Sequence, residues 1–376
     1  MEKHDCDNDT LLNGQLGLIF YYYHLYKVTE RPTLKHKMES LLEQVIANIH
    51  SKELTLAGPS LSTGAAGLGY VISFLCREGV LDAGIQQEME ALDKYLFNAA
   101  AGLIAADNTD YLHGALGVVH YFSGKWHTAP HISRYLDVVV EQLCNRAVQE
   151  GACRWFRGNP VKANGKQVIN FSLSRGQCGI LLVLINAFEA SAHRQLIADT
   201  LKGVIRFILK HKMDVDFSRN ECSFFPFVIR RGAQKISAPN RLAWCYGDLN
   251  QVLLFYRAGR LLNDESLLQL ADLTGMQSMM RRDEGSTMVT NSSFCHGAAG
   301  LSQLCKTLYH ESNQAGYKDG YEYWIEKLLL FLPGDLENGM YTGREHDYLE
   351  GLTGPAFALL SYVSGIHLNW SKILLL

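Results

Sequence analysis

The stretch Cys295-His296-Gly297-Ala298-Ala299-Gly300 opens an apolar run and carries two side chains that bind metals well. Its Gly-x-x-Gly step returns in variant form along the whole 376-residue chain. The variants read NGQLG, TGAAG, HGALG, RGQCG, YGDLN and EGLTG, with leading glycines at Gly14, Gly64, Gly114, Gly176, Gly247 and Gly351. With Gly297 included, the successive spacings are 50, 50, 62, 71, 50 and 54 residues, which indicates seven internal repeats.

A run that is apolar nearly all round follows each step, such as LGLIFYYYHLY from Leu16 and ILLVLINAF from Ile180. Such a run is typical of a helix that is buried on both sides. An amphipathic segment comes next; in residues 36–51, for example, the apolar side chains recur on one helical face. The sequence therefore predicts an all-α protein in which each repeat is a hairpin of an inner buried helix and an outer half-exposed helix.

The ends of the chain indicate how the hairpins assemble. Terminal repeats of an open solenoid usually become polar caps, whereas the first and last inner runs here are as apolar as the middle ones. We therefore expect seven helical hairpins with GxxG repeats to close into an α/α toroid, one domain over residues 1–376. The glycines would serve close packing of the inner helices, or turns with positive φ ahead of each one. Two longer connections, residues 155–167 and 224–239, are expected to hold short hairpins over one end of the molecule.

Composition narrows the class of protein. The chain has 35 basic and 38 acidic residues, a net charge of −3, and no basic stripe, so nucleic acid is not expected as a partner. The first ten residues carry no secretory apolar region, and no apolar stretch is long enough to span a membrane. The nine cysteines are odd in number and form no CxxC pair, which argues against a disulfide framework. We expect a cytoplasmic protein with no transmembrane segment.

The repeat also predicts where functional side chains gather. Directly ahead of the first glycine stand Asn13, Thr63, His113, Arg175, Tyr246, His296 and Glu350. In a closed ring these residues form a polar collar at one mouth of the barrel, at the N-terminal ends of the inner helices. We call the segment that carries each of them a collar turn.

A metal site is predicted at two neighbouring collar turns. Cys245 and Cys295 hold the same position in adjacent repeats, so they should lie side by side. With His296 they form a Cys-Cys-His set with an open fourth position, which is typical of catalytic zinc. The alternative, two core cysteines and a capping histidine, is more usual for isolated cysteines. The shared position favours zinc.

Two segments, RLAWCYGDLN at 241–250 and SFCHGAAGL at 293–301, resemble the lanthionine synthetase C-like cyclases, and the resemblance covers the whole chain with its seven repeats. It implies an α/α toroid with Zn²⁺ held by Cys245, Cys295 and His296. The family adds cysteine thiols of a peptide to dehydroalanine or dehydrobutyrine, which forms (methyl)lanthionine thioether rings in a ribosomally made peptide. The implied partners are a dehydrated precursor peptide with a leader and a separate dehydratase. Eukaryotic relatives resemble glutathione-adding enzymes instead.

The resemblance assigns further catalytic positions to Asp110, Tyr246 and Arg241. The family's catalytic histidine is replaced by Arg175, and arginine does not work as a general acid or base because its guanidinium stays protonated. We hypothesise that His113, on the adjacent collar turn, transfers the proton and that Arg175 stabilises the developing oxyanion. Alternatively, His113 only caps its helix or pairs with Asp110. A third possibility is that the loss of the family histidine marks a catalytically impaired, zinc-binding peptide scaffold.

A glycosidase on the same architecture is a third class. It requires paired carboxylates in the cavity, and the collar offers only Glu350 and the nearby Asp110. Neither carboxylate accounts for the Cys-Cys-His set, so the sequence favours the cyclase.

Overall fold

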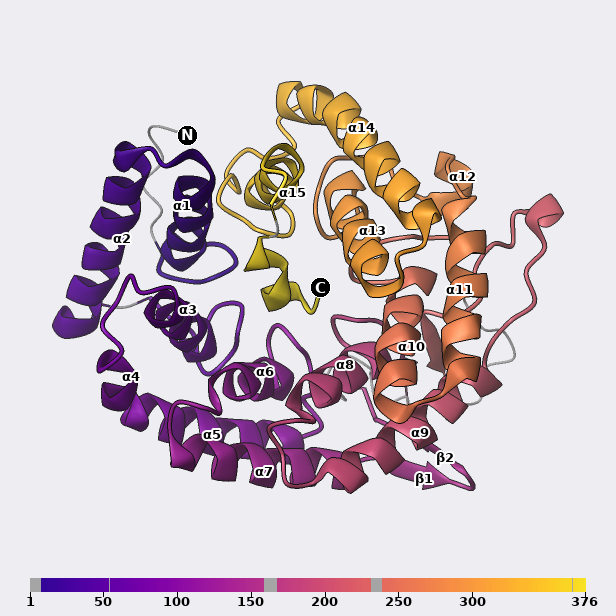
Figure 1. The fold of residues 1–376 in the computed structure, drawn as a ribbon, viewed down its shortest axis with the longest axis horizontal. Helices are drawn as coiled ribbons and strands as arrows, with labels where there is room; N and C mark the ends of the chain where they lie inside the picture. The colour runs from indigo at the N-terminus through magenta and orange to yellow at the C-terminus, as the bar shows by residue number, and fades with distance from the viewer. Residues whose placement is uncertain (1–7, 54, 159–167, 231–238, 367) are drawn as a thin grey trace.

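The computed structural model describes residues 8–53, 55–158, 168–230, 239–366 and 368–376. Among these residues, seven helices stand as an inner barrel and six surround them (Figure 1). The inner helices are α1 (Gln15–Thr29), α3 (Ala65–Arg77), α6 (Ala115–Lys125), α8 (Gln177–Ala187), α10 (Asp248–Leu262), α13 (Ala298–Ser312) and α15 (Thr353–Val363). The outer helices are α2 (Pro32–Ser51), α5 (Glu90–Ala105), α7 (Pro130–Asn145), α9 (Arg194–Lys210), α11 (Glu265–Met279) and α14 (Ala315–Glu337). The double ring confirms the predicted α/α toroid.

Burial separates the two sets of helices as the sequence predicts. In α8, every residue from Gln177 to Leu184 is buried, because the helix has other helices on all sides. In α7, the buried side chains recur at one-face spacing, from Ile132 through Leu136 to Leu143. Pro130 begins α7, where its missing N–H has no helical partner to lose. Each outer helix therefore seals the outside of the barrel with one face and meets solvent with the other.

The collar turns close the ring through backbone hydrogen bonds. Each turn donates an N–H to a carbonyl oxygen of the next turn, and the seventh donates to the first. The bonds run from Leu12 to Ser62, Ser62 to Leu112, Tyr111 to Ser174, Leu173 to Cys245, Cys245 to Cys295, Cys295 to Leu349 and Tyr348 to Leu12, with lengths of 2.7 to 3.4 Å. The last bond joins the two ends of the chain's repeat array, which excludes an open solenoid.

The glycines of the collar turns act mainly through close approach of the backbone. A Cβ on Gly300 would overlap the carbonyl oxygen of Phe294, six residues earlier, and equivalent overlaps occur at the second glycine of the other repeats that have one. Of the two roles expected for the first glycines, positive φ does not apply at five of them, whose φ values lie between −142° and −111°, nor at Gly351. Gly247 is the exception, with φ of 120°. There Asn250 replaces the second glycine, and its amide donates to the carbonyl oxygen of Trp244 at 2.9 Å.

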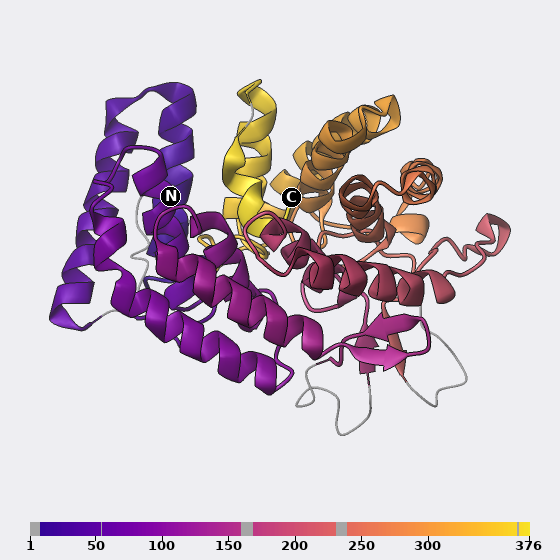
Figure 2. The same cartoon turned by 60° about the horizontal axis from the view of Figure 1, so that its bottom comes forward.

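Strands occur only beside the two long connections, among the described residues. β1 (Val148–Glu150) pairs with β2 (Cys153–Trp155), and β3 (Val168–Asn170) pairs with β4 (Val228–Arg230), both antiparallel. Figure 2 shows β1 and β2 outside the ring of helices. Most of the predicted hairpin at 155–167, and residues 231–238 of the other, lie outside the described residues. The β3–β4 pair joins the two connections to each other, a pairing that no feature of the sequence predicts.

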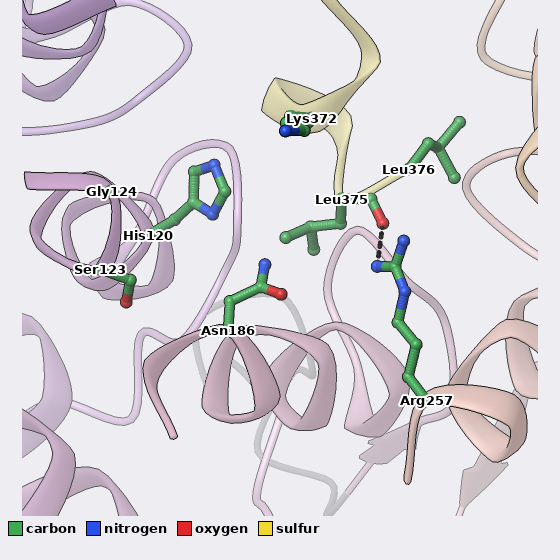
Figure 3. A pocket seen from close by; sticks show the side chains of 8 residues that line it. All are labelled: His120, Ser123, Gly124, Asn186, Arg257, Lys372, Leu375 and Leu376. Carbon is green, nitrogen blue, oxygen red and sulfur yellow. Dashed lines mark hydrogen bonds between the residues drawn. The ribbon is translucent and has the colours of Figure 1, made fainter. Parts of the chain in front are cut away.

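The seventh repeat differs from the others after its inner helix. The chain beyond α15 turns inward as the 3₁₀ helix η3 (Asn369–Leu374) and ends inside the barrel (Figure 1). Tyr111 and Trp244 donate to the carbonyl oxygens of Ile373 and Leu374, at 2.7 and 2.9 Å. Arg257 donates to the carbonyl oxygen of Leu375 at the edge of a pocket of about 310 Å³ (Figure 3). The C-terminal residues thus fill the middle of the toroid.

Three short helices, α4 (Ile85–Glu88), α12 (Glu284–Thr287) and η2 (Phe217–Arg219), lie in the connections. In the part of the chain that the structure describes, no helix is both long and apolar enough to cross a membrane.

Candidate metal centre

The three predicted metal ligands come together at two neighbouring collar turns. Cys245 lies on the turn ahead of α10, and Cys295 and His296 lie on the turn ahead of α13. The backbone bond from Cys245 to Cys295 fixes the distance between the two turns. One ligand atom from each of the three side chains lies within 4.8 Å of the others. Cys245 is buried, whereas Cys295 and His296 are half-buried, so the cluster faces the mouth of the barrel.

The cluster already favours one thiolate without a metal. A hydrogen bond from Cys295, together with the nearby His296, lowers the pKa of Cys245 below its ordinary value. The pKa of Cys295 is raised well above its ordinary value, because a second thiolate beside Cys245 and in a buried position is unfavourable. The hydrogen bond with Cys245 and the charge of Glu350 raise the pKa of His296. Of the two cysteines, Cys245 is therefore the one that more readily becomes a negatively charged soft donor.

These donors fit zinc. Two sulfurs and one imidazole are soft to intermediate donors, which suit Zn²⁺ better than Mg²⁺ or Ca²⁺. Three protein donors would leave room for a fourth donor from a substrate, as in catalytic zinc sites. Cys245, Cys295 and His296 are the residues that would hold the ion.

Glu350 supports this cluster from the seventh collar turn, a role that the sequence analysis did not assign to it. Its carboxylate lies 3.5 Å from Nε2 of His296 and interacts with the thiol of Cys295. The turn that carries Glu350 is held by Asp347, which accepts hydrogen bonds from the backbone N–H groups of Leu349 and Glu350 at 2.8 and 3.0 Å. A carboxylate that contacts a ligating histidine orients the ring and tunes its basicity. The sequence did contain a signal for this role. Glu350 is a collar residue, and all seven collar residues converge on one mouth.

A different pair forms at the third and fourth collar turns. Nε of Arg175 lies 3.2 Å from a carboxylate oxygen of Asp110, across the boundary between the repeats. The other oxygen of Asp110 accepts hydrogen bonds from the backbone N–H groups of Leu112 and His113, at 2.9 and 3.0 Å. Asp110 is 8% exposed, so this carboxylate is held firmly by its own turn and by the guanidinium. The side chain of His113 is exposed at the same rim.

The remaining predicted residues border the metal ligands. Tyr246 stacks on Phe227 with ring centres 4.8 Å apart, and its hydroxyl accepts a hydrogen bond from Asn170 at 3.0 Å. Asn170 belongs to β3, so the β3–β4 pair forms one side of the mouth. Arg241 lies close enough to His296 for its positive charge to oppose the rise in that histidine's pKa. Tyr246 and Arg241 therefore flank the cluster from the fifth repeat.

The family's sequence profile, described as lanthionine synthetase C-like protein, matches residues 5–375. The chain belongs to this family. Among solved structures, a nisin cyclase is similar over 99% of this chain and 93% of its own, with a TM-score of 0.78 and 17% sequence identity. No curated protein sequence matches the chain significantly. The lanthionine synthetase C-like fold thus accounts for the double ring of helices. At 17% identity, the similarity to the nisin cyclase structure is evidence for the fold alone.

Proposed function

We propose that the protein is a zinc-dependent lanthionine cyclase. It adds cysteine thiols of a peptide to dehydroalanine or dehydrobutyrine in the same peptide, which forms (methyl)lanthionine thioether rings. The observation that carries this proposal is the convergence of Cys245, Cys295 and His296 at the mouth of a lanthionine synthetase C-like toroid. Its partners would be a dehydrated precursor peptide with a leader and a separate dehydratase. A cytoplasm would suit it, because a reducing compartment keeps the ligand and substrate thiols free.

The first step prepares the nucleophile. A free peptide thiol is mostly protonated at neutral pH, and the thiolate is the reactive form. Zn²⁺ held by Cys245, Cys295 and His296 would lower the pKa of a substrate thiol at the open position. Glu350 orients His296 and so keeps the donor set in place. The two cysteine ligands carry negative charge, which keeps the substrate sulfur nucleophilic.

The second step forms the carbon–sulfur bond. The sulfur attacks the β-carbon of the dehydro residue, and the π electrons of the double bond move onto the α-carbon and its carbonyl oxygen. A guanidinium at the rim stabilises this enolate electrostatically. Arg241 lies beside the metal ligands, and Arg175 lies across the third and fourth turns, paired with Asp110.

The third step returns a proton to the α-carbon, so that the thiol proton and the sulfur have together been added across the double bond. We assign the donation of this proton to His113, because imidazole is the side chain most often used as a general acid. Its exposed position at the rim leaves room for a peptide. Tyr246, held between Phe227 and Asn170, is placed to position the peptide backbone.

One observation favours a second candidate function. The Arg175–Asp110 ion pair occupies the place of a proton-transferring histidine, which suits a zinc-stabilised peptide-binding scaffold without catalysis. The cyclase and the scaffold differ in whether thiols are consumed.

The test uses zinc-loaded protein and a dehydrated peptide that carries cysteine. Cyclisation leaves the peptide mass unchanged and removes one thiol from alkylation for each ring, whereas addition of glutathione would raise the mass by one glutathione. We expect loss of alkylatable thiol at constant mass, and no loss with Cys295→Ala. Retention of all thiols with the zinc-loaded wild-type protein would establish the scaffold instead.

A further inference from the structure

The seventh inner helix, α15, has no outer helix over it in the described part of the chain. The other six inner helices are each followed by an outer helix, whereas the chain after α15 turns into the barrel. In both ribbon views α15 lies between α1 and α14, and no helix stands outside it between α2 and α14 (Figures 1 and 2). Tyr362 and Val363 at the end of α15 are 47% and 72% exposed. The outer side of α15 thus presents apolar side chains, exposed at Tyr362 and Val363 and half-buried at Ala356 and Leu359.

The side of α14 that faces α15 lies next to this surface. Lys318 and Glu322 of α14 line a pocket of about 290 Å³ together with Tyr362 and Ile366, which identifies the facing side. Leu329 and Leu336 follow Glu322 by 7 and 14 residues, so they lie on the same side of the helix. They are 53% and 50% exposed, and Ile366 is 49% exposed. We call the surface formed by Leu329, Leu336, Tyr362, Val363 and Ile366 the outer groove.

The end of the outer groove far from the mouth is positively charged. Lys306 and Lys318 line it, and neither forms an ion pair with a carboxylate of the described residues. Lys306 instead donates to the carbonyl oxygen of Ser361 at 3.1 Å. Glu322 is the one carboxylate of the pocket lining. An occupant that places acidic side chains at this end would neutralise the excess charge.

The repeat fixes the direction that a helix in this position would take. Outer helices end beside the mouth: Asp335, near the end of α14, accepts a hydrogen bond from the backbone N–H of Ser292 on the sixth collar turn, at 2.7 Å. A seventh outer helix of the same polarity would end beside the first and seventh collar turns, where Asn13 donates to Asp347 at 2.9 Å. Glu350, which contacts His296, lies on that seventh turn. The chain that follows such a helix is therefore delivered next to the metal centre.

We propose that the outer groove binds an amphipathic helix of the precursor's leader peptide, with its C-terminal end at the mouth. A leader precedes the segment to be cyclised, so this polarity, and not the reverse, presents the reacting cysteines and dehydro residues to Cys245, Cys295 and His296. The inference rests on the proposed cyclase function. The eleven residues of α15 span about 16 Å, so a leader helix of three to four turns covers it. Its apolar residues recur as in α7, and its first turn is acidic, which complements Lys306 and Lys318.

The first test measures docking without catalysis. The probe is a fluorescein-labelled sixteen-residue peptide with the apolar spacing of α7 and Asp and Glu in its first turn, titrated with zinc-loaded full-length protein. We expect saturable anisotropy that weakens about tenfold or more in Leu329→Glu and in Val363→Glu. Leu330→Glu is the matched control: it is 65% exposed, but lies on the side of α14 where Tyr323 donates to Arg282. The three substitutions are on exposed positions and leave the fold intact; equal affinity in all three, or no binding by the wild type, overturns the proposal.

The second test assigns the occupant as a leader. The same helix is joined by a flexible linker either before or after a core peptide that carries one dehydroalanine and one cysteine. We expect a lower KM when the helix precedes the core, and no gain over the core alone when it follows; Leu329→Glu abolishes the gain. An equal KM in both orders overturns the leader assignment. Absence of cyclisation with all three substrates would instead refute the cyclase, while the anisotropy still reports docking.

Discussion

The fifth and sixth collar turns and the third and fourth use the same backbone frame for different chemistry. In each pair, a backbone hydrogen bond joins adjacent turns and brings side chains together across the repeat boundary. At the fifth and sixth turns the side chains are Cys245, Cys295 and His296, which make a donor set for a metal. At the third and fourth turns they are Asp110 and Arg175, which neutralise each other. The backbone frame determines which side chains come into contact. The residue types next to the first glycine then determine whether the contact is a metal donor set or an ion pair.

The largest expected effect is the loss of the metal. Cys245→Ala or Cys295→Ala should abolish stoichiometric zinc binding and lower cyclisation by about a thousandfold or more, because no other soft donor replaces the missing ligand. Metal analysis of the purified protein and the thiol assay measure the two effects. Cys305→Ala, at a buried cysteine on the neighbouring α13, should leave both unchanged. Zinc retained at full occupancy in Cys295→Ala would disprove the ligand assignment.

The next largest effect is expected at the third and fourth collar turns, which carry His113 and Arg175. His113→Ala should lower kcat by about a hundredfold to ten-thousandfold if His113 donates the proton. Restoring a histidine in the same protein, as His113→Ala with Arg175→His, should recover much of that loss, because the family's position would again hold an acid. Single-turnover rates on a dehydrated peptide provide the measurement. Full activity in His113→Ala would show that His113 takes no part.

A smaller effect is expected at the residue that supports the metal ligands. Glu350→Gln removes the charge beside His296 but keeps the shape of the side chain, so zinc affinity should fall by about tenfold to a hundredfold. Competition with a chromophoric chelator measures the affinity, and the spectrum of the cobalt-substituted protein reports the donor geometry. Glu350→Asp, which keeps the charge at a greater distance, should be intermediate. Unchanged zinc affinity and an unchanged cobalt spectrum in Glu350→Gln would show that Glu350 does not support the metal ligands.

The smallest effect on the candidate site is expected from His120, inside the third repeat. This residue should instead make the free energy of unfolding depend on pH. Burial lowers the pKa of His120 on α6 to about 4, so the folded chain binds no proton there while the unfolded chain does below about pH 6.5. The neutral ring is therefore favourable above pH 6.5, and this contribution is lost as the pH falls toward 4; it is on the order of 3 kcal/mol.

Denaturant unfolding between pH 7 and 4.5 tests this expectation. His120→Phe should flatten the dependence of the free energy of unfolding on pH, without changing zinc content at pH 7. The same substitution at His36, an exposed residue of α2, is the control and should keep the wild-type dependence. Identical slopes for His120→Phe and the wild type would contradict the argument.

The repeat made most of the fold predictable. The spacing of the glycine steps located the seven inner helices, and the shared position of Cys245 and Cys295 placed these two cysteines side by side. The role of the first glycines was harder to predict, because an overlap between a Cβ and a neighbouring backbone atom depends on the folded turn. Positive φ proved necessary only at Gly247, where Asn250 fills the place of a glycine.

Contacts that lie outside the repeat frame were not predictable. The pairing of β3 with β4 joins two irregular connections whose sequences carry no periodic signal. Glu350 was visible as a collar residue, but its approach to His296 depends on how the sixth and seventh turns stack. The C-terminal residues return to the centre of the barrel because side chains there bind them. The indole N–H of Trp244, for example, donates to the carbonyl oxygen of Leu374. Each of these features is decided by packing between distant segments.

The hydrogen bond from Tyr348 to Leu12 has a consequence for biosynthesis. Its two residues are 348 − 12 = 336 positions apart, which a ribosome translates in roughly 20 to 70 s. During that time the apolar inner helices have no completed barrel to enter, so the nascent chain depends on protection from aggregation. The turn that carries Cys295 also reaches its final position late, because the N–H of Cys295 is paired with Leu349 of the seventh repeat. The cluster of Cys245, Cys295 and His296 is therefore completed only after the seventh repeat has been synthesised.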